Sequence, residues 1–325
     1  MTPARAARIA VSLLRRSMGS ALVLLGASSL LFAVVRAAPG GASGLGQRLS
    51  GSSPPPAETP RPDAEAWPLA YARWVLRAAL GDFGRSTALQ QGRPVGELLI
   101  PAAVRSLGLA GAGLGLSALA ALALALYRTL RPRSCFARGA GVAAHVLSAV
   151  PVFLYVYAAV ACGNWLLAWG AREALWSLPG WFPFPARDSW VPWLVAAGIL
   201  AVGDSLLLDL YGTFSVDLEV ARSQDHLIGA RLLGLSVPGV VARGFLPGAA
   251  SHLSGRMGLI LSSLVVLESA LGWPGLGYLA WRAAAERDLP VLLGVTLVLA
   301  AGVQVWALVT EAIWRGLDPR SGAVR

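Results

Sequence analysis

The sequence predicts an all-α polytopic membrane protein with six transmembrane helices. Of its 325 residues, 56% are hydrophobic and only 14% are charged, whereas soluble domains are nearer one quarter charged. The apolar residues also come in blocks of about twenty, the length that a helix needs to cross a hydrocarbon core of ~30 Å. The six blocks that we expect to span the membrane lie at 17–37, 106–127, 140–162, 190–210, 254–272 and 290–314.

The first block is preceded by four arginines, as the n-region of a signal peptide would be, at Arg5, Arg8, Arg15 and Arg16. Its apolar core is longer than the roughly 7–15 residues usual in a signal peptide, and "VRAAPGGA" after it is a poor cleavage site. We therefore predict that residues 1–37 form a cytoplasmic N-terminus and an uncleaved first transmembrane helix.

The net charge of +10 comes largely from arginines in the loops between the predicted spans. The chain contains no lysine, so all 27 basic residues are arginine. Arginines gather in loops on the cytoplasmic side of a membrane. They gather here in the connections after the second and fourth spans and in the C-terminal tail: Arg128, Arg131, Arg133 and Arg138; Arg222, Arg231, Arg243 and Arg256; Arg315, Arg320 and Arg325. This pattern predicts an inner-membrane protein with both termini in the cytoplasm. A nucleic-acid partner is not expected, because the basic residues are not interleaved with stacking aromatics.

Residues 38–105 form the predicted external segment. Its first part, 38–66, is rich in Gly, Ser and Pro, which is typical of a linker. Residues 67–83 read as a short amphipathic helix with Trp67, Tyr71, Trp74 and Leu80 against the membrane interface. The remaining 106–325 is the predicted five-helix core, and tryptophans recur at its span ends, as in an aromatic belt.

We expect no catalytic residue, no cofactor and no metal site. Two cysteines, Cys135 and Cys162, cannot form a disulfide framework or a zinc cluster, and the histidines lack ligand spacing (His145, His226, His252). The serines of "GASS" at 26–29 have no nearby histidine to act as a base. The few acidic residues in or beside the spans are too sparse for a proton relay: Asp204, Asp209, Glu268 and Glu311.

The longest cytoplasmic connection is the predicted loop 211–253. A chain without lysine cannot contain a P-loop, so any nucleotide hydrolysis must occur on another polypeptide. Residues 216–235 read as a helix ended by Gly234 and then Pro238-Gly239, followed by a second element ending at Pro247. Such a knob suits insertion into a groove on a partner, with a plain interfacial connector as the alternative.

Several motifs then resemble one family in chain order, the permeases of dipeptide, oligopeptide and nickel ABC importers. "SQDHLIGARLLGLS" (223–236) resembles that family's "QDYVRTARAKGLS", although Ile228 stands where the family has its leading glutamate. "LESALGWPGLGYLAWRAAAERDLPVLLG" (267–294) resembles its "ETVFxWPGLG" followed by "RDxPxxxG", and "GDFGRSTALQQGRPVGELLIPAAVRSL" (81–107) resembles its "GDLGxSxxxxxPVxxLIxxRLPATL". "RAAPGG" (36–41), "SAVPVF" (148–153) and "LDPR" (317–320) are similar to further family segments.

The resemblance implies a type I ABC-importer permease fold and a set of partners. These are cytoplasmic ABC ATPases, a second homologous permease that forms a heterodimer with this chain, an external or periplasmic solute-binding protein and the lipid bilayer. It implies an ATPase-coupling role for Asp225, Ala230, Arg231, Gly234, Leu235 and Pro247. It also marks an external family motif made of Glu268, Trp273, Pro274, Gly275, Gly277, Asp288 and Pro290.

We thus predict a membrane-spanning, non-enzymatic subunit of an ATP-driven importer for peptides or a related small solute. One alternative is a secondary, ion-coupled transporter, which would need paired inverted repeats or several intramembrane charges. A membrane-embedded enzyme is a further alternative, and it would need a converging nucleophile and base.

Overall fold

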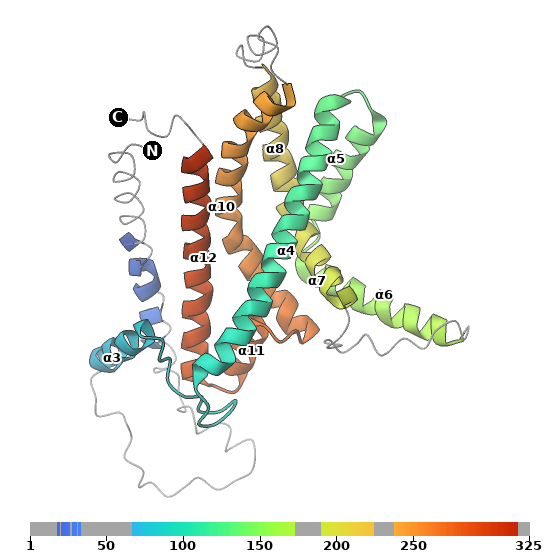
Figure 1. Ribbon diagram of the computed structural model, residues 1–325. Coiled ribbons are helices and arrows are strands. Elements are labelled where there is room, and N and C mark those ends of the chain that lie inside the picture. Colours follow the sequence, from blue (N-terminus) through green and yellow to red (C-terminus); the bar gives the residue numbers. More distant parts are fainter. Residues whose placement is uncertain are drawn as a thin grey trace, which may run out of the picture. The chain divides into compact units, whose positions relative to one another are not determined.

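The computed structural model describes residues 18–19, 21–26, 28–30, 32–33, 67–172, 190–223 and 237–317. Within these ranges all regular structure is helical apart from one isolated bridge between Arg85 and Pro94. The prediction of an all-α protein is therefore confirmed. The helices, coloured along the chain in Figure 1, are α3 (Trp67–Ala79), α4 (Val95–Leu130), α5 (Cys135–Ser148), α6 (Val152–Arg172), α7 (Trp190–Val202), α8 (Leu206–Ser223), α10 (Val237–Leu271), α11 (Leu276–Ala285) and α12 (Leu289–Leu317).

Three stretches are long and apolar enough to cross a membrane, namely Val95–Leu130, Ser251–Leu271 and Leu289–Ile313. Two bent helix pairs, α5 with α6 and α7 with α8, raise the number in the described part of the chain to five if each pair is one span. These five stretches coincide with the predicted second to sixth spans. The predicted first span is represented by the short apolar helix Ala21–Leu30.

The third and fourth predicted spans each correspond to a bent pair of helices. The α5–α6 pair is bent by 96° and the α7–α8 pair by 57°. Pro151 stands at the first break and has no backbone N–H to continue a helix. At the second break, Asp204 and Ser205 have φ angles of 48° and 65°, a left-handed conformation that interrupts the helical ladder.

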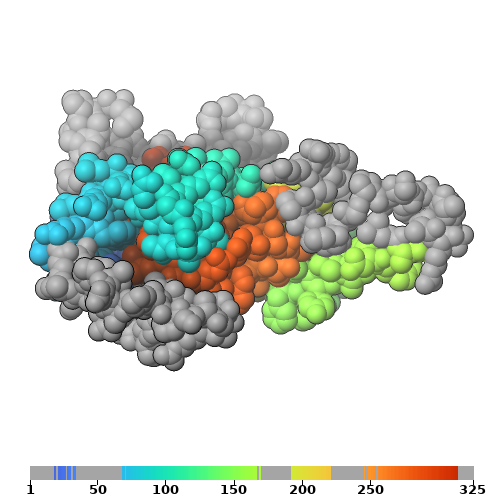
Figure 2. All heavy atoms as spheres, turned by 90° about the horizontal axis from the view of Figure 1, so that it is seen from below, coloured from blue at the N-terminus to red at the C-terminus, as the bar shows by residue number. Residues whose placement is uncertain are grey.

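The described residues divide into two compact units, one drawn from 10–106 and 274–302 and the other from 107–273 and 303–317. In the first unit, the start of α4 packs against α11 and the start of α12. On each of these helices the core residues recur at intervals of three, four or seven, so they lie on one face. The shared core consists of Val95, Leu99, Ala102, Leu276, Ala283, Val291 and Val295. Figure 2 shows this core region from below, with the start of α4 beside the segment that contains α11 and the start of α12.

The second unit is built around the pairing of α8 with α10 (Figure 1). Phe214 and Phe245 meet edge to face with ring centroids 5.2 Å apart, and Leu210, Leu264 and Leu267 are fully buried. The indole N–H of Trp306 in α12 donates to the Leu253 carbonyl of α10 at 3.0 Å. These contacts make α8 and α10 a packed antiparallel hairpin whose connection, 224–236, lies outside the described residues.

Candidate functional site

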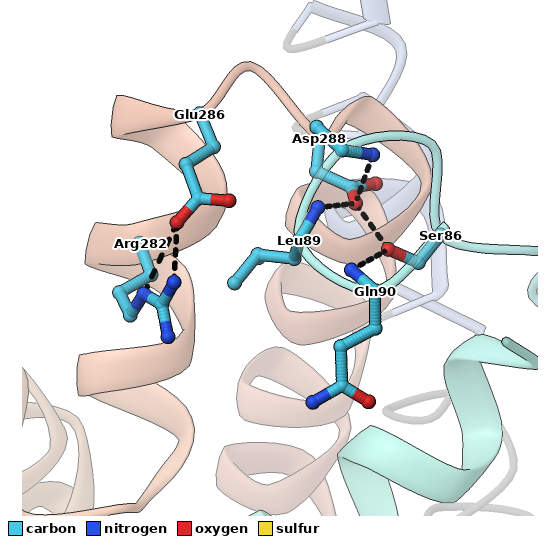
Figure 3. A network of polar contacts seen from close by, with 7 residues as sticks. Ser86, Leu89, Gln90, Arg282, Glu286 and Asp288 are labelled. Carbon is cyan, nitrogen blue, oxygen red and sulfur yellow. Dashed lines mark hydrogen bonds and ion pairs between the residues drawn. The ribbon is translucent and has the colours of Figure 1, made fainter. Parts of the chain in front are cut away.

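Two motifs singled out in the sequence, 81–107 and 267–294, come together around one carboxylate (Figure 3). Asp288 is fully buried. Its Oδ2 accepts the Ser86 hydroxyl at 2.5 Å and the backbone N–H groups of Thr87, Ala88 and Leu89 at 3.1, 3.0 and 3.0 Å. The loop before α4 thus forms an anion-binding nest that is filled by a side chain 199 to 202 residues away.

The same carboxylate begins α12. Its Oδ1 accepts the N–H of Val291, three residues on, at 3.4 Å, which is the bond that an N-cap aspartate makes. Pro290 lies in the first turn of α12, where a missing N–H removes no helical bond. A negative charge at this end also suits the dipole of the helix, so the "RDLP" sequence is a helix start in its own right.

Hydrogen bonds in this nest stabilise the ionised carboxylate of Asp288 more than burial destabilises it. Burial raises the pKa of Asp288, but the hydrogen bonds from Ser86, Ala88, Leu89 and Thr87 lower it, and the net result is a pKa below the ordinary 3.8. Asp288 is therefore an ionised, hydrogen-bonded anchor. Its oxygens accept hydrogen bonds from the loop 86–89 and from the start of α12, as expected of a structural group.

The loop that carries the nest is itself held tightly. The N–H of Ser86 donates to the Arg93 carbonyl at 2.9 Å, and the N–H of Val95 donates to the Gly84 carbonyl at 3.0 Å. Gly84 and Gly92 have φ angles of 87° and 80°, which glycine adopts without strain. The family-like glycines of 81–92 are thus explained by backbone geometry. Ser86 and Ser106 were missed as site residues, and the only signal was their presence inside the motif.

The "GWPGLG" turn between α10 and α11 is fixed at both ends. Gly272 has a φ of 65° and the N–H of Trp273 donates back to the Glu268 carbonyl at 2.9 Å, which closes α10 with a glycine C-cap. On the other side, the buried hydroxyl of Ser106 accepts the N–H of Leu276 at 2.7 Å, and Arg105 donates to the Pro274 carbonyl at 3.2 Å. Gly275 is the N-cap of α11, where Gly277 is buried.

Glu268, the first residue of the predicted external motif, is fully buried near the C-terminal end of α10. The motif residues therefore do two distinct things. Asp288 and Pro290 start a helix and hold a loop, whereas Trp273 to Gly277 shape the turn between two helices.

The predicted coupling residues Asp225, Ala230, Arg231, Gly234 and Leu235 lie outside the described residues. Pro247 was expected to end a short element, and this was wrong. Helix α10 begins at Val237, contains Pro238-Gly239 in its first turn and continues through Pro247 to Leu271. A proline in a first helical turn costs no hydrogen bond, which is why Pro238 does not break the helix.

The two helices that flank this loop are linked by polar pairs. Arg256 in α10 forms an ion pair with Asp209 in α8 at 2.6 Å. His252 lies 3.1 Å from the Asp217 carboxylate, and Gly248 approaches the same carboxylate so closely that a Cβ there would stand 2.7 Å from Oδ2. The helices entering and leaving the loop are thus joined over several turns. Across the described ranges, no group of three or more His, Cys, Asp or Glu side chains could hold a metal ion.

No family model matches the chain. It is 27% identical over 323 residues to the oligopeptide transport system permease protein AppB of Bacillus subtilis, an alignment that covers 96% of this chain and 99% of that relative. It is 27% identical over 263 residues to a putative peptide permease protein of Brucella suis, covering 78% of this chain and 79% of the relative. It is 28% identical over 145 residues to the glutathione transport system permease protein GsiC of Escherichia coli K12, covering 43% of this chain and 46% of the relative.

These relatives are transport subunits rather than enzymes. Their similarity extends over nearly the full length of the chain, and the helical fold with its apolar spans is that of a multi-pass inner-membrane protein. Over most of its length, the chain is therefore similar to the permease subunits of peptide transport systems.

Proposed function

We propose that this permease is one of two membrane subunits of an ATP-driven, binding-protein-dependent importer of peptides or a related small solute. The observation that carries the proposal is the near end-to-end similarity to an oligopeptide permease. The second membrane subunit is a related but different chain, and separate ATPases and a solute-binding protein complete the importer. Both termini of the permease lie in the cytoplasm.

The coupling step is assigned to the connection between α8 and α10. Asp225, Ala230, Arg231, Gly234 and Leu235 would face the groove of the ATPase. The Asp209–Arg256 ion pair and the Asp217–His252 contact support this assignment, because they join the two helices that leave the connection. A push on the connection then moves α8 and α10 together as a rigid body, and Pro247 moves with α10.

The partner set is tested by affinity purification of the tagged chain in mild detergent. The importer predicts co-purification of an ABC ATPase and a second permease. Recovery of neither, together with sodium- or proton-dependent uptake by this chain alone in liposomes, would instead establish the secondary transporter.

Coupling is tested by Gly234→Trp, because a large side chain at the expected turn blocks seating in a groove. We expect solute transport to fall at least about tenfold, the effect of ~1.4 kcal/mol, while ATP hydrolysis and membrane insertion persist. Gly139→Trp is the matched control, since Gly139 is exposed at the start of α5 with no atom near its Cβ position. Normal transport by Gly234→Trp would show that the coupling assignment is wrong.

A further inference from the structure

Three candidate spans meet at one polar contact, and Asp204 is at its centre. Asp204 lies at the break between α7 and α8. Its Oδ1 accepts the N–H of Val152, the first residue of α6, at 3.4 Å, and its Oδ2 accepts the hydroxyl of Ser263 in α10. Next to it, the Ser205 hydroxyl donates to the Ser148 carbonyl at the end of α5 at 3.3 Å.

These contacts lie near the middle of all three spans. With a rise of 1.5 Å per residue, Asp204 is roughly 18 Å along its span from Pro192, a little more than half of a ~30 Å hydrocarbon core. Ser263 is near the midpoint of the span Ser251–Leu271, and residues 149–151 divide the pair Cys135–Leu166 near its middle. If each bent pair is one span, the three spans agree in putting this carboxylate near the middle of the membrane.

Asp204 is nevertheless exposed on the surface of the single chain. A carboxylate at the bilayer centre costs about 2.5–3.5 kcal/mol on insertion scales, so such groups face a bundle interior or water rather than lipid. In a two-permease importer, the surface that is exposed on one subunit and must avoid lipid is the one that lines the path between the subunits.

The surroundings of Asp204 favour a cation. Among the residues that the structure describes, no arginine or histidine forms an ion pair with this carboxylate. Two of about four lone-pair positions are used by Val152 and Ser263, which leaves acceptor capacity on the exposed side. The C-terminal carbonyls of α5, which carry the negative end of the helix dipole, lie beside it. Broken helices at mid-membrane depth present such carbonyls to positively charged ligands in other transporters.

We propose that Asp204 binds the positively charged amino group of the transported solute as it passes the middle of the membrane. This inference rests on the proposed importer function and names its substrate class: solutes with a protonated amine, such as peptides with a free amino terminus. An inorganic coupling cation is the other possible source of positive charge, but an importer driven by ATP requires none.

The test measures transport by the complete importer, with its binding protein, in proteoliposomes. Each variant is given a peptide with a free amino terminus and the same peptide N-acetylated. Since the binding protein is identical throughout, differences between variants belong to the permease. We expect Asp204→Asn and Asp204→Ser to slow the free-amine peptide about tenfold and the acetylated peptide less than about twofold.

Two control variants separate recognition from structural support. Asp204→Glu keeps the charge and should keep the preference for the amine. Ser263→Ala removes the bond to α10 but keeps the carboxylate, so it should also keep the preference. Equal losses for both peptides, no loss for either, or a dependence of wild-type transport on sodium would overturn the role of Asp204. Failure of the wild-type importer to move either peptide would instead refute the peptide-import function.

A labelling experiment tests the position of residue 204 without any transport assay. Replacing both native cysteines, as Cys135→Ser and Cys162→Ser, gives a cysteine-free background. In the assembled importer, Asp204→Cys should react with a water-soluble, membrane-impermeant thiol reagent. Leu210→Cys, at a fully buried position in α8, should not react. An unreactive Asp204→Cys would show that the residue does not face the path.

Discussion

At the scale of single residues, Asp288 connects segments that are far apart in the sequence. One carboxylate starts α12 and accepts a hydroxyl and three N–H groups from the loop 86–89. Removing the charge of Asp288 leaves these buried donors without a full set of acceptors. The loss of folding free energy is larger than for an exposed hydrogen bond.

We therefore expect Asp288→Asn to destabilise the folded permease by about 2 kcal/mol. Glu97→Gln is the matched control, because its pair with Arg93 has side chains 57% and 49% exposed and should contribute less than about 0.5 kcal/mol. Denaturant unfolding of the detergent-purified importer measures both variants. Equal, small effects would contradict the role assigned to the nest.

The lowered pKa of Asp288 also predicts a pH dependence. The unfolded chain has the ordinary value of 3.8 and the folded chain a lower one, so the stabilisation is complete above the unfolded value and is lost as pH falls through the folded value. The stability difference between wild type and Asp288→Asn should stay constant from pH 7 to about 5 and shrink below about 4. A difference that grew on acidification would contradict this assignment.

At the scale of helices, close packing depends on glycine at particular faces. Gly113 in α4 is buried, and a Cβ there would stand 2.8 Å from the Cβ of Leu200 in α7. Gly111, two residues earlier, is exposed and has no atom within 4 Å of that position. The two glycines therefore have different roles on one helix.

Gly113→Leu should separate α4 from α7 and cost about 1–3 kcal/mol as an overpacked contact. Gly111→Leu should change stability by less than about 0.5 kcal/mol. Thermal unfolding of the two variants in the same detergent provides the comparison. If Gly111→Leu were as damaging as Gly113→Leu, packing against Leu200 would not be the reason for glycine.

The helices were predictable from sequence where composition alone decides them. Apolar blocks located the second to sixth spans, because crossing a membrane requires length and hydrophobicity regardless of neighbours. The bend between α7 and α8 was not predictable, since it has left-handed backbone at two non-glycine residues, Asp204 and Ser205, whose side chains bond to α5, α6 and α10. Pro238 was predicted to break a helix but lies in the first turn of α10. Whether a proline breaks a helix depends on where that helix begins, which the sequence did not reveal.

The sequence predicted the motifs that form the site but not the contacts between them. The sequence marked Asp288 and the 81–107 segment separately, but nothing in either stretch says that Ser86 bonds to a residue 202 positions later. Glycines with positive φ, such as Gly84 and Gly272, explain part of each motif by local geometry. The remainder needed the packing of α4 against α11 and α12.

At the scale of the whole molecule, the arginine distribution predicts which side of the membrane each terminus faces, and this orientation can be checked directly. Alkaline phosphatase fused after Arg325 should be inactive, whereas a fluorescent protein at the same place should fluoresce, because that end is expected in the cytoplasm. Phosphatase inserted within 38–66 should be active. An active C-terminal phosphatase fusion would reverse the predicted orientation.

The span of 202 residues between Ser86 and Asp288 also sets an order for biosynthesis. At ~5–20 residues per second, about 10–40 s pass between synthesis of the nest and synthesis of the carboxylate that fills it. During that interval the N–H groups of 87–89 have no anion to bind, and a chain cut short before Asp288 never supplies one. The filled nest can thus form only in chains that extend at least as far as Asp288.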